Sequence, residues 1–346
     1  MKDITFNLGI KKIGTNHPCF IIAEIGSNHN NNIKIAKKSI LEAAKGGADA
    51  VKFQTFKAKN HYSKFTPGFN YLNKKNTFNL IKKLELDRNW QKELKIYAEK
   101  LGLIFFSSPC DTEAVDQLNE LKVKLHKVAS FDITDQFLLK KIASSKKPVI
   151  ISTGLANDED IKHAIRACLK SKNNKIILLQ CTSLYPAPSK LSNLNAIISM
   201  KKKYGYLTGY SDHTIGDHNA IAAVALGAKV IEKHFTLSQK MVGPDHKFAI
   251  EPLEFGLMVK KIREIESGMG DGVKKGPRTE EMEMYKKGRR SIHFNKNLSK
   301  GSIIKKTDLV IKRPGLGIIP SKVNKIIGKK LKKSAKADQW LTWDMI

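Results

Sequence analysis

The chain has 346 residues, of which 41% are hydrophobic and 27% are charged. This composition excludes a disordered or collagen-like protein, and at about 150 residues per domain the length predicts two domains. No apolar run approaches the roughly 20 residues that cross a bilayer, and the first residues do not resemble a signal peptide, so we expect a cytoplasmic protein with no membrane partner. The four cysteines form no CxxC pair and are expected to be reduced thiols: Cys19, Cys110, Cys168 and Cys181.

Basic residues outnumber acidic ones by 62 to 32, which gives a net charge of +30. Such a charge is typical of proteins that bind nucleic acid, but only seven of the 62 are arginines, the residue that nucleic-acid readers favour. The lysines are spread along the whole chain. We interpret them as a solvated surface with no nucleic-acid partner, whose positive field would attract anionic small molecules. A binding module for polyanions is the alternative, and it predicts salt-sensitive affinity.

Short apolar, β-branched runs alternate with segments of helical periodicity. The predicted strands are Cys19–Gly26, Ala50–Thr55, Leu103–Ser107, His126–Ser130, Pro148–Thr153, Ile176–Cys181, Tyr206–Ser211 and Val230–Thr236. The predicted helices include Ile33–Lys45, Asn89–Leu101, Asp111–Leu121, Asp158–Leu169, Leu194–Lys203, His218–Leu226 and Glu254–Glu266. Eight strand–helix repeats predict an α/β fold, a parallel (β/α)8 barrel. An open doubly wound sheet alternates in the same way, but no GxGxxG follows the first strand.

Three segments depart from this alternation. Residues 56–86 are rich in Lys and Asn and predict a loop with a short helix over the barrel's mouth. A glycine-dense stretch at 268–277 predicts a linker, and short strands and turns follow it. We therefore expect a barrel over residues 1–270, a linker over 271–287 and a small β-rich domain over 288–346. A domain of this size is marginally stable without a partner surface.

Polar side chains gather at the carboxyl ends of the predicted strands, where barrels place catalytic groups. They are Glu24, Lys52, Gln54, Ser107, Ser108, Lys127, Ser130, Asp132, Ser152, Thr153, Thr182, Ser183, Tyr185, Ser211, Asp212, His213, Glu232, His234 and Thr236. Inward positions of a barrel are ordinarily Val, Ile or Leu, and buried charges need partners or a ligand. The pattern predicts an enzyme.

His213 and His234 end neighbouring strands, with Asp245 in the loop beyond and Glu24 on the adjacent closing strand. Two imidazoles with carboxylates suit Mn²⁺, Mg²⁺, Fe²⁺ or Zn²⁺ in a site with open positions. The alternative is a pair of hydrogen-bonded core histidines.

Lys52 and Lys127 would be cations inside the lumen, where an unpaired charge is costly. A bound phosphate or carboxylate is the simplest partner for them. Pairing with Glu24 or Asp132 is the alternative.

Several motifs, taken together and in order, resemble the sialic acid synthase family. They are IAEIGSNH at 22–29, ADAVKFQT at 48–55, CTSLYP at 181–186, GYSDHT at 209–214, EKHFT at 232–236, GPDHK at 243–247 and KRPG at 312–315. The resemblance implies a (β/α)8 barrel followed by an antifreeze-like SAF domain, in a domain-swapped homodimer whose small domains cap the partner's barrel.

The same resemblance implies a C–C bond-forming transferase. The family condenses phosphoenolpyruvate with an N-acetylated hexose, N-acetylmannosamine or a 2,4-diacetamido analogue, to a nine-carbon 2-keto acid and phosphate. It uses a divalent metal, expected to be Mn²⁺, with Mg²⁺ or Co²⁺ as alternatives.

The family's residue roles carry over by motif. His213 and His234 would bind the metal that activates the sugar's aldehyde. The substrate-binding positions would be Lys52, Gln54, Ser108, Lys127, Ser130, Ser152, Ser183 and Ser211, with Arg313 reaching the N-acetyl group from the partner chain. The catalytic positions would be Glu24, Tyr185, Asp245 and Asp132. Asp132 stands where the family commonly has Glu, which moves its carboxylate by about one bond length and leaves its role as general acid or base open.

The motifs divide over the product. Residues 129–131 and 106–109 look like the pseudaminic acid branch, whereas 53–56 and 243–247 look like the neuraminic and legionaminic branches. We favour N-acetylneuraminate or legionaminate synthase, because the loop at 243–247 is expected to contact metal and sugar. Pseudaminic acid synthase is the alternative. Another phosphoenolpyruvate-dependent synthase of 3-deoxy-sugar acids would share the barrel and lack the tail domain.

Overall fold

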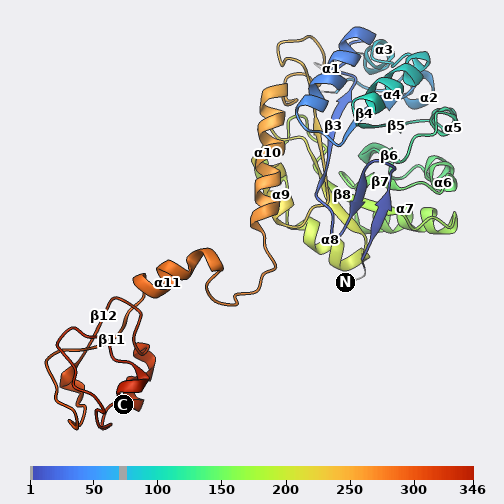
Figure 1. The fold of residues 1–346 in the computed structure, drawn as a ribbon. Coiled ribbons are helices and arrows are strands. Elements are labelled where there is room, and N and C mark those ends of the chain that lie inside the picture. The colour runs from blue at the N-terminus through green and yellow to red at the C-terminus, as the bar shows by residue number, and fades with distance from the viewer. Residues whose placement is uncertain (1–2, 70–75) are drawn as a thin grey trace. The chain divides into compact units, whose positions relative to one another are not determined.

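The computed structural model describes residues 3–69 and 76–346. In this part of the chain, eight parallel strands form one nearly closed barrel in the order β5-β4-β3-β10-β9-β8-β7-β6, and β5 lies beside β6 where it closes (Figure 1). The strands are β3 Phe20–Gly26, β4 Ala50–Thr55, β5 Ile104–Pro109, β6 His126–Val128, β7 Val149–Ser152, β8 Ile176–Cys181, β9 Leu207–Asp212 and β10 Val230–His234. Each matches a predicted strand, so the barrel prediction is confirmed.

Helices follow the strands and cover the outside of the barrel (Figure 1). They are α1 Ile33–Lys45, α4 Gln91–Lys100, α5 Thr112–Glu120, α6 Gln136–Ser144, α7 Asp158–Lys170, α8 Ala196–Tyr204, α9 His218–Ala225 and α10 Pro252–Gly268. Side chains fix several of their starts. The Asn32 amide oxygen accepts from two backbone N–H groups of α1, and Asn157 forms a capping box with Asp160 at the start of α7.

Alternate residues of each strand face the lumen, and their character changes along the strand. The first lumen positions form a single apolar cluster: Phe20, Ile22, Ala50, Ile104, Phe106, Leu125, Ile150, Ile177, Leu179, Leu207 and Val230. The next lumen positions toward the carboxyl ends are polar, as in β3, where Glu24 follows Ile22. The same two-residue period therefore builds an apolar floor and places charged groups above it.

An N-terminal hairpin closes the amino end of the barrel. Strands β1 (Thr5–Asn7) and β2 (Lys12–Gly14) pair antiparallel, and Leu8 and Ile13 are buried in the apolar cluster of the lumen. The sequence analysis did not predict this hairpin, because its strands are only three residues long.

The long segment after β4 carries two short helices, α2 (Ala58–His61) and α3 (Thr77–Lys83), where we expected one. Glu85 fixes α2, because its carboxylate accepts from the backbone N–H of Ala58 at 2.7 Å and from Lys57 Nζ at 3.1 Å. Residues 70–75 of the predicted loop lie outside the described residues.

The chain divides into two compact units, residues 1–270 and 271–346. In the second unit, β11 (Ser291–Phe294) pairs antiparallel with β12 (Leu309–Lys312). Its own core includes Ile292, Phe294, Ile304, Ile318, Ile326, Leu331 and Leu341. Helix α11 (Met282–Gly288) occupies part of the stretch that we expected to be linker. Among the described residues, no helix has both the length and the apolar character needed to span a membrane.

Candidate active site

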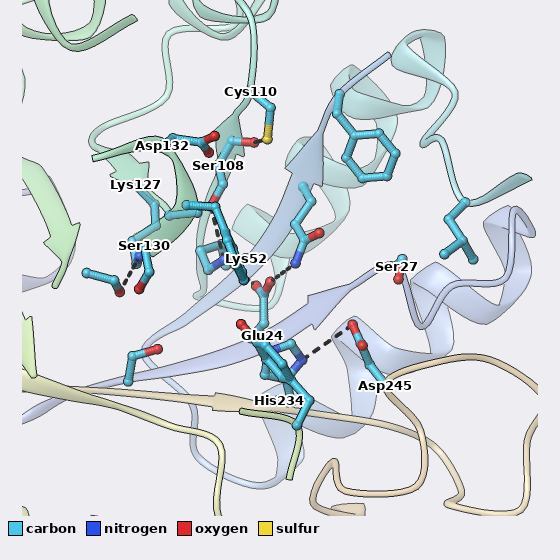
Figure 2. A pocket seen from close by; sticks show the side chains of 18 of the residues that line it. Glu24, Ser27, Lys52, Ser108, Cys110, Lys127, Ser130, Asp132, His234 and Asp245 are labelled. Carbon is cyan, nitrogen blue, oxygen red and sulfur yellow. Dashed lines mark hydrogen bonds and ion pairs between the residues drawn. The ribbon is translucent and has the colours of Figure 1, made fainter. Parts of the chain in front are cut away.

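A pocket opens at the carboxyl ends of the barrel strands, above the apolar floor. Figure 2 shows charged side chains from β3, β4 and β6 converging in it. The predicted site residues that line it are Glu24, Lys52, Gln54, Ser108, Lys127, Ser130, Asp132, Ser152, Tyr185, Ser211, His213, His234 and Asp245. Strand periodicity explains part of the convergence, because those of these residues that lie on strands continue the lumen-facing rows. The others lie in the turns and loops after β6, β8, β9 and β10: Ser130, Asp132, Tyr185, His213 and Asp245.

Lys52 and Glu24 form the centre of a buried charge network (Figure 2). Lys52 Nζ lies 2.8 Å from Glu24 Oε2 and 3.6 Å from Glu232 Oε1, and it donates to Ser108 Oγ at 3.1 Å. Gln54 Nε2 donates to the other oxygen of Glu24 at 2.8 Å. Burial alone would lower the pKa of Lys52, but Glu232 and Glu24 outweigh it and raise that pKa. Lys52 is therefore a paired, charged ammonium.

Lys127 has a different environment. Its Nζ donates to Val128 O at 2.8 Å and to Ser152 Oγ at 2.6 Å, and no carboxylate among the described residues lies within ion-pair distance of it. Burial lowers the pKa of Lys127. The expected alternative, an ion pair with Asp132, is thus not formed, and a bound anion would stabilise the charged form of this lysine.

Two serine hydroxyls converge beside Gly154, just after β7. Ser130 Oγ accepts from the Gly154 N–H at 3.1 Å, and Ser183 Oγ is buried without a hydrogen-bond partner. A Cβ on Gly154 would lie 2.3 Å from Ser183 Oγ and 2.8 Å from Ser130 Oγ. Only glycine leaves this space, so the backbone and both hydroxyls form a small polar recess next to Lys127 and Ser152.

His213 and His234 come together as predicted, with their ring centroids 5.3 Å apart. His213 Nδ1 lies 2.8 Å from the carbonyl oxygen of Thr182, an arrangement in which Nδ1 carries the proton and Nε2 is left with a lone pair. His234 Nδ1 is buried without a hydrogen bond, and Asp245 Oδ2 lies 3.7 Å from it. Burial, His213 and nearby lysines hold the pKa of His234 well below its usual range, so the ring is neutral.

These donors fit a divalent cation with open coordination positions, since two imidazoles lie together and one of them faces a carboxylate. The protein would supply few ligands, because the described residues contain no compact group of three or more His, Cys, Asp or Glu side chains. Asp245 is the carboxylate next to this histidine pair. Burial, reinforced by Glu24, raises the pKa of the Asp245 carboxyl to about 6.

Asp132 lies at the other side of the pocket, beside Cys110 (Figure 2). It follows β6 in a 3-10 turn, Ser130–Asp132, where we predicted the strand to continue to Ser130. Burial raises the pKa of Asp132.

The Tyr185 ring lies against the histidine pair, 4.4 Å from the His213 ring.

Two predicted site residues lie outside the pocket lining. Ser183 borders the recess at Gly154, as described above. Arg313 belongs to the second unit, where it is exposed and its Nε donates to Gly288 O at 2.6 Å.

The structure also adds residues that we did not assign to the site. They include Ser27, Phe56, His61, Tyr62, Cys110 and Cys181. Glu232, which we noted at a strand end without giving it a role, lines the pocket because it precedes His234 by two positions on β10 and so faces the lumen with it. The residues near α2 gave no signal, since periodicity does not fix the path of a long loop.

A (β/α)8 barrel with a charged pocket at the carboxyl ends of its strands is the arrangement found in (β/α)8-barrel enzymes. A comparison with protein families matches residues 39–274 to the NeuB family and residues 289–346 to the SAF domain. The chain therefore belongs to the NeuB family, and several of its relatives are named as synthases of sialic-acid-type sugars.

Three relatives illustrate the relationship. The chain is 44% identical to an N,N'-diacetyllegionaminic acid synthase of Campylobacter jejuni, over 92% of this chain and 97% of the relative. It is 34% identical to a pseudaminic acid synthase of the same species, over 94% and 95%. A crystal structure of N-acetylneuraminic acid synthetase from Leptospira borgpetersenii matches with a TM-score of 0.75 and 36% identity, covering 81% of this chain and 95% of that one.

Proposed function

We propose that the protein condenses phosphoenolpyruvate with a 2,4-diacetamido hexose to form a legionaminic-type nine-carbon 2-keto acid and phosphate. The observation that carries this proposal is the pocket itself, where a buried lysine without a carboxylate partner, a serine-lined recess and a pair of histidines face the same space. The first two suit a small dianion and the third suits a metal-bound carbonyl.

The anionic substrate would occupy the lysine side of the pocket. Lys127 would neutralise one of its anionic groups, Lys52 would donate to it while keeping its ion pairs with Glu24 and Glu232, and the serine hydroxyls would donate hydrogen bonds to it. The hydrogen-bonding serines would be Ser108, Ser130, Ser152, Ser183 and Ser211. Phosphoenolpyruvate carries both kinds of anionic group on three carbons, which fits two cations in one lumen.

His213 and His234 would hold the divalent cation, with Mn²⁺ expected first and Mg²⁺ or Co²⁺ as alternatives. Bound there, the cation would supply Lewis-acid polarisation of the sugar's aldehyde. Asp245 and Tyr185 border the same position and would orient the sugar chain.

The reaction joins C3 of the enol to the aldehyde carbon of the open-chain sugar. The aldehyde oxygen becomes an alkoxide and takes up a proton. Water adds to C2 and loses a proton, and the resulting tetrahedral carbon expels phosphate to leave a 2-keto acid. Glu24, which contacts Lys52 and Gln54, would exchange a proton with the aldehyde oxygen. Asp132 lies across the pocket and would take the proton of the water.

The identity of the sugar rests on the relatives. A legionaminic acid synthase is 44% identical to this chain, whereas a pseudaminic acid synthase is 34% identical. The difference favours a 2,4-diacetamido legionaminic precursor, with N-acetylmannosamine and the pseudaminic precursor as the alternatives to be tested.

We also propose a homodimer in which the second unit of each chain covers the partner's barrel mouth. Loops at that mouth, following β6 to β10, carry exposed apolar side chains: Phe131, Leu155, Leu184, Leu191, Ile215 and Val242, with 55%, 72%, 46%, 47%, 59% and 90% of their surface accessible. Such a ring of apolar side chains favours a protein partner. Arg313 would then reach the N-acetyl group from the partner chain.

The proposal is tested by phosphate release from phosphoenolpyruvate with Mn²⁺ and, in turn, each of the three sugars. We expect release with the diacetamido legionaminic precursor, loss of it in EDTA and its recovery with added Mn²⁺. The His234→Ala variant provides the inactive control. Release with another of the sugars would change the branch, and silence with all three in folded, metal-loaded protein would refute the proposal.

A further inference from the structure

His61 is a pocket residue that the proposed reaction leaves without a role. It ends helix α2, and its Nδ1 lies 3.9 Å from Asp132 Oδ1. The two side chains are 20% and 10% exposed, so both are largely shielded from solvent. They are 71 positions apart in the sequence and meet only because the segment after β4 passes over the pocket.

The other groups that face Asp132 do not neutralise it. Cys110 at the end of β5, Tyr62 after α2 and Asp135 at the start of α6 are neutral or acidic. Lys127 on β6 acts on Asp132 through space, but its ammonium is held by Val128 O and Ser152 Oγ. Among the described residues, the Cys110 thiol offers Asp132 a weak hydrogen bond, and the imidazole of His61 is the remaining group able to offer this carboxylate a proton or a positive charge at short range.

The imidazole is also held in place. The ring of Phe56 stacks against it with a centroid separation of 6.3 Å, and the Tyr62 ring meets it edge-on at 4.8 Å. Glu85 anchors the start of the same helix. The ring therefore has a defined position next to the carboxylate.

We propose that His61 is a positioning residue that holds the Asp132 carboxyl and favours its ionised form, so that Asp132 can accept a proton during the reaction. The inference rests on the proposed function, in which Asp132 takes the proton of the water that adds to C2. Burial raises the pKa of this carboxyl and His61 lowers it. A general base must be ionised, so the histidine would extend the pH range in which Asp132 is active.

The test compares His61→Gln with Lys59→Gln, an exposed neighbour on the same helix. His61→Gln should lower kcat at least about tenfold, a part of the 10²–10⁴-fold that a positioned acid or base contributes, and shift the acid limb of the kcat profile to higher pH. The KM for phosphoenolpyruvate and the melting temperature should stay near wild type. Lys59→Gln should change none of these. An unchanged acid limb in His61→Gln would overturn the inference.

Two further measurements distinguish failure of the inference about His61 from failure of the proposed function. In an Asp132→Asn background, His61→Gln should produce no additional loss; an undiminished additional loss would show that His61 does not act through Asp132. The carboxyl titration of Asp132, followed by ¹³C NMR and assigned with Asp132→Asn, needs no catalysis. Its midpoint should rise in His61→Gln, and an equal midpoint would overturn the inference even if wild-type protein makes no product.

Discussion

Lys52 and Glu24 face each other in register on neighbouring strands, with 2.8 Å between Nζ and Oε2. Lys127 lies in the same lumen without such a partner. The two lysines thus differ in what they need: the first already has its counter-charge, and the second obtains one only when an anion binds.

The stability of the ligand-free protein should separate these lysines. Lys52→Met leaves Glu24 and Glu232 buried without their cation, which should cost about 3–5 kcal/mol of unfolding free energy. Lys127→Met should change it by no more than about 1 kcal/mol, because loss of two hydrogen bonds is offset by removal of a desolvated charge. Denaturant unfolding without ligand measures both. Equal losses would mean that Lys127 has a partner we have not identified.

Metal binding should depend on both histidines. His213→Ala or His234→Ala should lose Mn²⁺ and activity while the fold survives, because each removes a donor from a site with few protein ligands. His163→Ala, at an exposed position on α7, is the matched control. Bound metal would be counted after dialysis, with circular dichroism to check the fold. Wild-type metal content in either variant would remove that residue from the ligand set.

The Asp245 carboxyl should make the ligand-free protein less stable as the pH rises from 4 to 6. Its pKa is raised to about 6 in the folded state, so the folded protein binds this proton more tightly than the unfolded chain does. Stabilisation from the protonated form is complete below the unfolded value near 4 and is lost through pH 6, by up to about 3 kcal/mol. Asp245→Asn should flatten this part of the stability profile, measured by denaturation in EDTA. A profile equal to that of wild type would contradict the assignment.

Substitution of Arg313 tests the proposed homodimer. Arg313→Ala should raise the KM of the sugar more than that of phosphoenolpyruvate, because the residue is proposed to contact only the N-acetyl group. Lys322→Ala, another exposed cation of the second unit, should alter neither. Steady-state kinetics with each substrate varied in turn would decide. If both KM values moved equally, the role of Arg313 as a sugar contact would be wrong.

The strands of the barrel could be predicted because each is a short apolar run with a polar end. The alternation that makes Ile22 part of the floor makes Glu24 part of the site, and this regularity is visible in the sequence. Positions that depend on irregular backbone were not predictable in the same way. His61 and Phe56 enter the pocket through the path of a long loop, and Leu8 and Ile13 fill the lumen from a hairpin with strands of three residues.

The role of Arg313 could not be predicted from the strand pattern either, for a different reason. Its motif is plain in the sequence, but it lies in the second unit of the chain, so neither periodicity nor the barrel's geometry relates it to the pocket. Only the resemblance to a family suggested its role.

The N-terminal hairpin closes the lumen below the pocket. Because Leu8 and Ile13 pack into the amino end of the lumen, we expect molecules to enter and leave through the mouth. Lys52 and Glu232 precede Gln54 and His234 by two positions on their strands, so their Cα atoms lie roughly 6.6 Å farther from the carboxyl ends, measured along the strands. A ligand held at the deeper level must therefore arrive before the one above it and depart after it. In the proposed two-substrate reaction, this geometry would favour a compulsory order in which the anion binds first and the nine-carbon product leaves before phosphate.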